Sequence, residues 1–389
     1  TLSATVRLAL LPRDGCFCTD GRGWHTSASG RGHGLDWPWP STVLGALRTA
    51  WGRGEESRTG QTFDRHTWRE RTAGVTLGRT LVLRRPPGTP WGREHRLWPK
   101  PADAVCMEGD QKQRRLEPLR PRLPSLGRDD DEARELLWVP ELPSKKEPLR
   151  AEGWWSEDRF TSWLAGGSVP AQDPANLLAL PRRVQVHVGI RPEQQTADAG
   201  VLFSHDVLET LEAGAEWAIG LEGSLPAAGT PAVVTLGSDR RLAWVEVLPE
   251  LAFDPPETVM QVFRSGSAGL RLFVVSPASF QRGWLPDGIR RQGRQFRGQI
   301  AGVDGDVVLR AAMVSRPLHV SGWDMAASAP KSTSRMVPPS AVYFFEREDG
   351  RQFGESEART LWLGALGSRT QEGFGRMLPG VWSPRRSAR

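Results

Sequence analysis

The sequence contains little cysteine and no long apolar run. Its 389 residues include three cysteines, which are too few for a disulfide framework and cannot form a zinc site by themselves. No stretch of about 18 consecutive apolar residues occurs, and the apolar part of the first residues is too short for a signal peptide. We therefore expect a soluble, cytoplasmic protein with reduced cysteines, no bound metal and no membrane partner.

Recognisable catalytic motifs are missing as well. The sequence has neither a phosphate-loop lysine motif nor an HExxH motif, and no two histidines stand at the spacing of metal ligands. The acidic run at 128–135 has no ordered spacing of carboxylates, so it indicates a solvated loop and not a metal site. No cofactor is expected, and these absences favour a binding protein over an enzyme.

Positive charge is in excess. Lysine and arginine together number 51 against 45 aspartates and glutamates, which gives a formal net charge of +6 at pH 7. Arginine greatly outnumbers lysine, and the guanidinium group makes planar, bidentate contacts with phosphate and stacks on bases. An anionic partner is therefore expected. A GC-rich genome is a second explanation for the excess of arginine, because it would enrich arginine, glycine, proline and tryptophan without any function.

A glycine-rich stretch at 361–382 combines a helical apolar pattern, a polar loop and a closing strand. Alternating glycines beside an arginine suggest backbone amides presented to an anion, although a glycine-rich turn entering an edge strand fits the same pattern. Because no catalytic lysine or metal ligands accompany the glycines, we expect them to hold a backbone phosphate and not a small nucleotide. The predicted RNA-binding residues of this stretch are Arg369, Gly373, Phe374, Gly375 and Arg376.

A second candidate site lies near the start of the sequence. A strand expected at 5–11 leads into a glycine-rich segment at 14–35, which is predicted to be an exposed loop with a positive lining. A helix should follow, capped by Ser41 or Thr42, with its free amides pointing back towards the loop. The predicted RNA contacts of this region are Arg13, Arg22, His25, Arg31, His33, Ser41, Thr42 and Arg48.

The second half of the sequence is dominated by strand patterns. Val184, Val186, Val188 and Ile190 alternate with polar or small residues, and we take this strand as the beginning of a second domain. Because strands outnumber helices and short turns join most of them, the predicted class is α+β with antiparallel sheets. Helices are expected at 206–213 and 256–263, and further strands at 200–203, 217–221, 232–236, 242–247, 270–275, 307–314, 341–345 and 377–382.

Two basic segments in this half are further candidates for RNA contact. The segment at 290–297 interleaves arginines with one aromatic residue, a pattern that can follow a nucleic-acid backbone and stack a base. The polar loop at 328–335 carries one lysine and one arginine. The predicted contacts of these segments are Arg291, Arg294, Lys331 and Arg335.

The ordered set of motifs resembles the RAMP superfamily of CRISPR RNA-binding proteins. Within it, the sequence is similar to the third-named subunit of the type III-B (Cmr) effector complex, which holds the 5′ tag of the guide RNA. The motifs that carry the resemblance are Arg13-Asp14-Gly15, the segment 40–48, Val188-Gly189-Ile190 with 200–203, the segments 283–286, 322–324 and 337–344, and Gly373-Phe374-Gly375 with Gly380.

The resemblance implies a fold, a function and a set of partners. It implies two ferredoxin-like (RRM-like) domains, at 1–181 with a thumb-like insertion at about 52–155, and at 182–389. It also implies a non-catalytic subunit that binds the 5′ tag of the CRISPR RNA (crRNA). Its protein partners would be the large polymerase/cyclase-type subunit and the first backbone subunit of the filament, and it would meet target RNA only indirectly.

Two other functions stay open at this stage. A RAMP endoribonuclease that processes precursor crRNA would need a general acid and base, for which His25, His33 and Lys331 are the candidates. An assembly scaffold would need no RNA contact at all. Cleavage of precursor RNA without metal would identify the first, and unaltered RNA binding after charge reversal at Arg22, Arg31 and Arg376 would identify the second.

Overall fold

The computed structural model describes residues 3–18, 31–32, 34–108, 114–123, 137–149, 153–167, 178–212, 214–226, 230–324, 327 and 329–384. Across these residues the chain forms two large antiparallel sheets and few helices, which confirms the predicted α+β class. The two ferredoxin-like domains and the thumb stay predictions. Among the described helices, none has the length and apolar character that a membrane span requires.

The first large sheet takes strands from both sides of position 181. Its order is β14-β15-β1-β13-β3-β4-β9, and β12 pairs with β13. Its strands are β1 (Ser3–Pro12), β3 (Thr76–Arg85), β4 (Arg96–Pro99), β9 (Trp154–Ser156), β12 (Leu211–Glu212), β13 (Ala215–Pro226), β14 (Val233–Leu236) and β15 (Arg241–Val247). The sheet therefore contains strands from both sides of the predicted domain boundary at residue 181. The range 52–155, which was predicted to be an insertion, includes β3 and β4 of this sheet.

The second large sheet has the order β17-β18-β19-β24-β16-β26-β25. Its strands are β16 (Gly269–Val274), β17 (Ile289–Gln292), β18 (Gln295–Gly298), β19 (Val307–Met313), β24 (Val342–Arg347), β25 (Gly364–Ala365) and β26 (Arg376–Trp382). The four strands predicted at 270–275, 307–314, 341–345 and 377–382 are confirmed. They form because runs of β-branched and aromatic residues bury both faces of a central strand, as in β24.

Five helices and three single-turn 3₁₀ helices accompany the sheets within the described residues. They are α1 (Pro40–Thr59), α2 (Arg65–Thr72), α4 (Glu157–Leu164), α5 (Glu257–Arg264), α6 (Glu355–Leu361), η2 (Arg93–His95), η5 (Ser238–Arg240) and η6 (Glu250–Phe253). The helix predicted at 256–263 is α5. The predicted cap of α1 is wrong, because its N-cap is Trp39, which makes no capping hydrogen bond, and Pro40 fixes the first turn instead.

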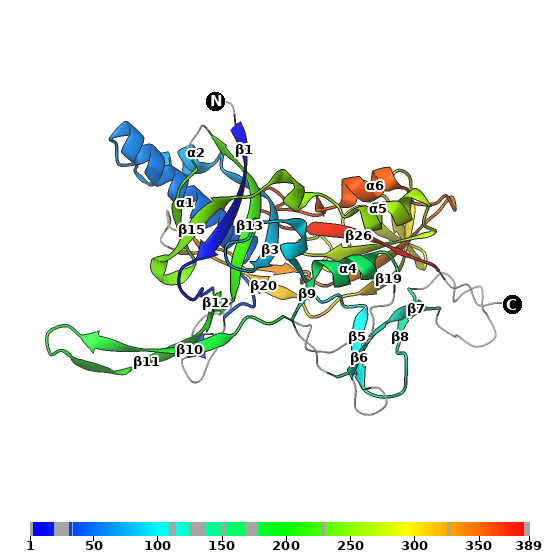
Figure 1. The fold of residues 1–389 in the computed structure, drawn as a ribbon, viewed down its shortest axis with the longest axis horizontal. Coiled ribbons are helices and arrows are strands. Elements are labelled where there is room, and N and C mark those ends of the chain that lie inside the picture. Colours follow the sequence, from blue (N-terminus) through cyan, green and yellow to red (C-terminus); the bar gives the residue numbers. More distant parts are fainter. Residues whose placement is uncertain are drawn as a thin grey trace.

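The third sheet is a long hairpin that extends from the body of the molecule (Figure 1). It consists of β10 (Arg182–Arg191) and β11 (Thr196–Leu208), and β2 (Arg31–Gly32) pairs with β11. The helix predicted at 206–213 is wrong, because residues 206–208 continue β11 and pair with the start of β10. Shorter pairs are β5 (Ala104–Glu108) with β6 (Arg114–Pro118), β7 (Arg120–Arg122) with β8 (Val139–Glu141), β20 (Leu318–Val320) with β23 (Ser334–Met336), and β21 (Trp323–Asp324) with β22 (Ala329–Pro330).

The two large sheets share one core. Leu81 and Leu83 of β3 pack in the same apolar cluster as Leu270 and Leu272 of β16, together with residues of α4, α5 and α6. The other face of β1 and β3 packs under α1 in a separate cluster. The relative position of the two sheets is therefore fixed by burial, and the loops between them form a defined surface.

Candidate nucleic-acid interface

The glycine-rich loop lies between α6 and β26 and is packed against both large sheets. Gly373 has φ +89° and Gly375 has φ +73°, in the left-handed region that favours glycine. A Cβ atom on Gly373 would lie 2.9 Å from Pro40 Cβ, and one on Gly375 would overlap the carbonyl oxygen of Leu366. Glycine is therefore required at these two positions because other parts of the protein pack against them, and not because a ligand does.

The amides of this loop are already used inside the protein. The N–H of Gly375 donates to Pro277 O at 2.8 Å, and that of Gly373 donates to Thr370 O at 3.2 Å. The N–H of Arg376 donates to Ser276 Oγ at 2.9 Å. These three amides cannot also hold a phosphate, which contradicts the predicted anion cradle.

Phe374 is fully buried. Its ring packs in a small apolar cluster with Trp39, Val320 and Met336, and the guanidinium of Arg369 lies 4.7 Å from the ring centre. A ring without exposed surface cannot stack on a base, so the predicted RNA contact of Phe374 is wrong. The residue anchors the loop against the N-terminal end of α1 instead.

Arg376 is also directed inwards. Its Nη2 donates to Thr370 O at 2.7 Å, and burial, helped by the nearby charge of Arg79, lowers its pKa to about 10 against the opposing effect of Glu222. A guanidinium held between backbone carbonyls in this way stabilises the loop. The prediction that it contacts a phosphate gains no support from its position.

Three of the predicted cations do come together beside the loop. Arg369 holds Glu372 through two hydrogen bonds of 2.9 and 2.6 Å, and Arg48 and Lys331 are close enough to act on the same carboxylate. Partial burial alone would raise the pKa of Glu372, but the hydrogen bonds from Arg369 and the three positive charges lower it overall. We call Arg48, Lys331, Arg369 and Glu372 the cationic cluster, and its three cations outnumber its single carboxylate.

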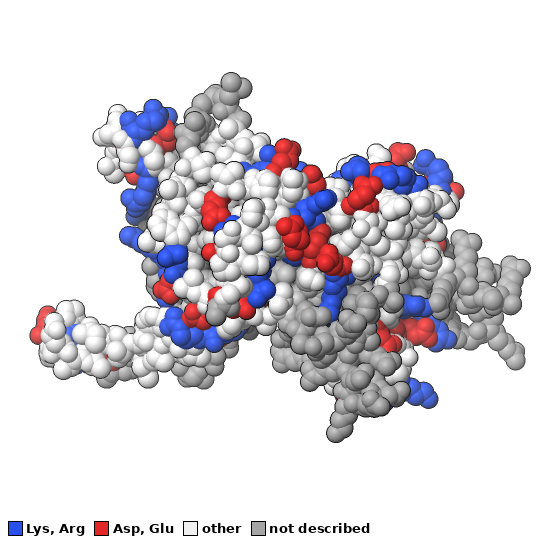
Figure 2. All heavy atoms as spheres, in the orientation of Figure 1, with Lys and Arg blue, Asp and Glu red and all other residues white. Residues whose placement is uncertain are grey.

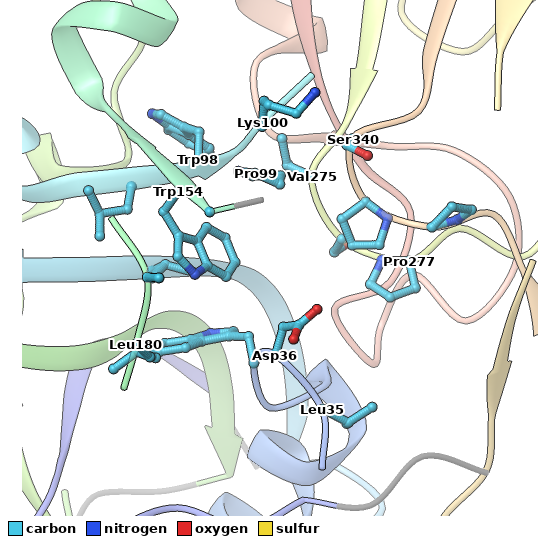
Figure 3. Close-up of a pocket in the computed structure, with 18 of the residues that line it drawn as sticks. Leu35, Asp36, Trp98, Pro99, Lys100, Trp154, Leu180, Val275, Pro277 and Ser340 are labelled. Atoms are coloured by element: carbon cyan, nitrogen blue, oxygen red, sulfur yellow. The ribbon is translucent and has the colours of Figure 1, made fainter. Parts of the chain in front are cut away.

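A cleft of about 770 Å³ lies between the two large sheets, next to the loop. Trp154 lies on one wall, and Pro277 and Ser340 lie on the facing wall (Figure 3). Lys100 also lines the cleft, and its Nζ donates to Ala104 O at 2.6 Å. Half-buried indole rings and hydroxyl groups on facing walls are suited to planar, partly polar ligands such as nucleobases.

The cleft and the cationic cluster lie on either side of the glycine-rich loop, which contacts residues of the cleft. Trp39 lines the cleft and also packs against the Phe374 ring. Ser276, another lining residue, donates from Oγ to Gly373 O at 2.9 Å. The glycine-rich loop therefore connects an aromatic cleft on one side with a positively charged surface on the other.

The sequence did not predict the cleft. Its residues come from α1, β4, β9 and the loops that follow β16 and β23, so no local pattern joins them. The one available signal was the unusual number of tryptophans, 17 in the whole chain. Within the described residues, no group of three or more histidines, cysteines or carboxylates is arranged to hold a metal ion.

The remaining predicted residues are spread over the surface or lie outside the described residues. Figure 2 shows basic side chains, with acidic ones among them, at the end of α1 that projects from the body of the molecule. Ser41 and Thr42 lie in the first turn of α1, and Arg335 lies on β23. The others are Arg13 beside the ring of Trp244, Arg291 and Arg294 at the turn of β17 and β18, Arg31 in β2, and Arg22, His25 and His33, which lie outside the described residues.

The chain is a CRISPR-associated protein, because the model of one family of such proteins matches residues 8–382. That family is Cas_Cmr3, and the chain belongs to it, which confirms the predicted family and makes the protein a subunit of a type III-B effector. Among proteins with curated descriptions, none matches the chain in sequence.

Solved structures of the type III-B Cmr-beta complex contain similar chains. One, bound to cognate target RNA and AMPPnP in state 1, matches with 13% identity and a TM-score of 0.40, covering 87% of this chain and 86% of that chain. Another, bound to cognate target RNA, matches with 12% identity and a TM-score of 0.37 over the same shares of the two chains.

Proposed function

We propose that this subunit binds the single-stranded 5′ tag of crRNA without cleaving it. In the assembled effector it would bridge the large polymerase/cyclase-type subunit and the first backbone subunit. The observation that supports the proposal best is that the glycine-rich loop links the tryptophan-lined cleft to the cationic cluster. A single-stranded RNA needs both surfaces, because its phosphates are anionic and its unpaired bases expose aromatic faces.

In this proposal the basic surface binds the phosphates of the RNA and the cleft binds its bases. Phosphates would lie along Lys331 and Arg335, which are both exposed, while Arg48 and Arg369 are partly occupied by internal hydrogen bonds. Bases would enter the cleft beside Trp154, where stacking contributes about 1–3 kcal/mol per base. The 2′-hydroxyls would distinguish RNA from DNA at the hydroxyl-bearing wall.

Titration of labelled, tagged crRNA with the double variant Lys331→Ala and Arg335→Ala tests the proposal. Affinity should fall about three- to tenfold, and the slope of log K against log salt should become shallower by about 1–2, because fewer counterions are released on binding. The matched control is Arg351→Ala with Arg359→Ala, which removes two charges at exposed positions outside the cluster.

Three results would contradict the proposal. Equal affinity of the double variant and the wild type would show that neither Lys331 nor Arg335 contacts the RNA. Equal affinity for tagged and untagged RNA would show that the tag is not the ligand. Cleavage of precursor crRNA without metal, lost on Lys331→Ala or His25→Ala, would identify the chain as an endoribonuclease.

The proposed bridging role is tested by reconstituting the effector without this chain. The expected result is that the large subunit no longer associates with the rest of the complex.

A further inference from the structure

Two cysteines lie side by side in the segment that follows β1. Cys16 and Cys18 belong to the core cluster under α1, where both side chains are buried. Their sulfur atoms are 3.9 Å apart, a distance at which one thiol donates a weak hydrogen bond to the other. The chain has only one other cysteine, Cys106. Two of the three thiols of this protein are therefore placed close enough to react with each other.

The two thiols differ in their electrostatic surroundings. Arg241 is held by hydrogen bonds of 2.6 Å to Asp14 and 2.7 Å to Gln185. The hydrogen bond with Cys18 and the positive charge of Arg241 lower the pKa of the Cys16 thiol although burial opposes them. The same hydrogen bond, together with burial, raises the pKa of the Cys18 thiol. Cys16 therefore becomes a thiolate, the nucleophilic form of cysteine, more readily than Cys18 does.

The backbone around the pair is bonded to two other parts of the fold. Hydrogen bonds of 2.8 Å join Cys16 to Leu208, at the end of β11, in both directions. The N–H of Leu35 donates to Cys18 O at 2.8 Å, and Leu35 also lines the cleft between the two large sheets. A rearrangement of residues 16–18 would therefore reach the base of the hairpin and one wall of the cleft.

Phe17, between the two cysteines, is held on two sides. Its carbonyl oxygen accepts a hydrogen bond of 3.0 Å from the N–H of Ser238, and its ring stacks on His205 with the ring centres 3.9 Å apart. To form a disulfide, the two sulfurs must approach from 3.9 Å to about 2 Å. The contacts of Phe17 oppose that movement, so we expect the bond to form together with a local rearrangement of this segment.

We propose that Cys16 and Cys18 are a reversible redox pair, which a peroxide oxidises to a disulfide, and that this oxidation loosens the cleft wall at Leu35. The Cys16 thiolate attacks one oxygen of hydrogen peroxide, the O–O bond breaks, and a sulfenic acid forms as hydroxide leaves and takes up the Cys16 proton. The Cys18 sulfur then attacks the Cys16 sulfur, and the hydroxyl group leaves as water. The two thiols lose two electrons and two protons, and the peroxide is reduced to two waters. The inference does not depend on where RNA binds.

Treatment of the purified full chain with hydrogen peroxide tests the pair directly. Trypsin cleaves after Arg13 and Arg22, so one peptide, 14–22, carries both cysteines. Its mass should fall by that of two hydrogen atoms, on the order of tenfold faster than Cys106 is oxidised, and dithiothreitol should reverse the change. Cys106 is the matched control, because it is also buried but lies in β5. An unchanged peptide, oxidation no faster than that of Cys106, or a disulfide between two chains would each overturn the proposal.

Single variants separate the roles of the two thiols. Cys18→Ser removes the thiol that resolves the sulfenic acid, so the acid should accumulate on Cys16 and react with dimedone. Cys16→Ser should give little dimedone labelling of Cys18, because the less reactive thiol remains. Equal labelling of the two variants would contradict the assigned roles.

Hydrogen exchange measures whether the disulfide affects the cleft wall. Oxidation of the wild-type chain should speed exchange of the Leu35 amide on the order of tenfold, because its hydrogen bond to Cys18 O is disturbed. The control is Cys16→Ser, which cannot form the disulfide, so peroxide should leave its exchange at Leu35 unchanged. Equal exchange at Leu35 in the reduced and oxidised wild-type chain would contradict the coupling to the cleft.

Discussion

The glycine-rich loop and the β10–β11 hairpin show opposite relations between sequence pattern and environment. The loop carries glycines, an aromatic and an arginine, yet Phe374 is buried and the amides of Gly373 and Gly375 are satisfied internally. The hairpin carries a regular apolar alternation that is typical of a core strand, yet Val184 and Val186 are exposed. Period and composition predicted most of the local backbone in both regions, apart from the end of β11, but they did not predict what each side chain faces.

The difference has a physical cause. A loop rich in polar residues and glycine becomes buried when other segments close over it, as Pro40 and Leu77 do around Gly373. An apolar strand stays exposed when no other segment of the chain packs over one of its faces, as around Val186. Burial is decided by long-range contacts that a window of sequence does not contain.

The predictable parts of the fold are those determined by local periodicity. The alternation in 5–11 and the helical pattern before Phe263 predicted β1 and α5, because the apolar residues repeat at the period of a strand and of a helix. Residues 206–208 were misassigned to a helix, since their strand state depends on pairing with Arg182–Val184 across the hairpin. The division into domains at residue 181 remains a prediction.

The candidate site was predictable only in part. Arg48, Lys331 and Arg369 were predicted separately, and the structure brings them together at Glu372. That carboxylate lies three residues after Arg369, but the pair stands in the loop between α6 and β26, where the helical spacing rule for opposite charges does not apply. The cleft had no local signal either, because its walls come from separate parts of the chain.

The substitution Phe374→Ala tests the buried character of the loop most strongly. It should reduce the free energy of unfolding by about 3–5 kcal/mol, because it removes a fully buried aromatic ring and leaves a cavity beside Trp39 and Met336. Urea unfolding followed by tryptophan fluorescence measures the change. Normal stability together with weakened RNA binding would instead indicate that Phe374 is exposed and stacks on a base. The loop would then not differ from the hairpin in burial.

The substitution Gly375→Ala tests the same region through the backbone. Both Gly375 and Gly350 have positive φ, at +73° and +75°, but only at Gly375 would a Cβ overlap a neighbouring carbonyl, that of Leu366. Gly350→Ala should therefore cost only the backbone strain of about 1–2 kcal/mol. Gly375→Ala should cost about 1–3 kcal/mol more, because the loop must move to relieve the overlap. Equal losses of stability for the two variants would mean that the loop is not closely packed.

The smallest effect is expected in the hairpin, where Val186→Thr should change the free energy of unfolding by less than about 0.5 kcal/mol. Val186 is more than half exposed, so a hydroxyl in place of one methyl group stays in contact with water and leaves no buried polar group unsatisfied. The control is Val82→Thr in β3, where the side chain is buried in the core under α1 and the same change should cost more than about 1 kcal/mol. A loss at Val186 as large as that at Val82 would show that the chain itself covers Val186, and the contrast between the exposed hairpin and the buried loop would then be lost.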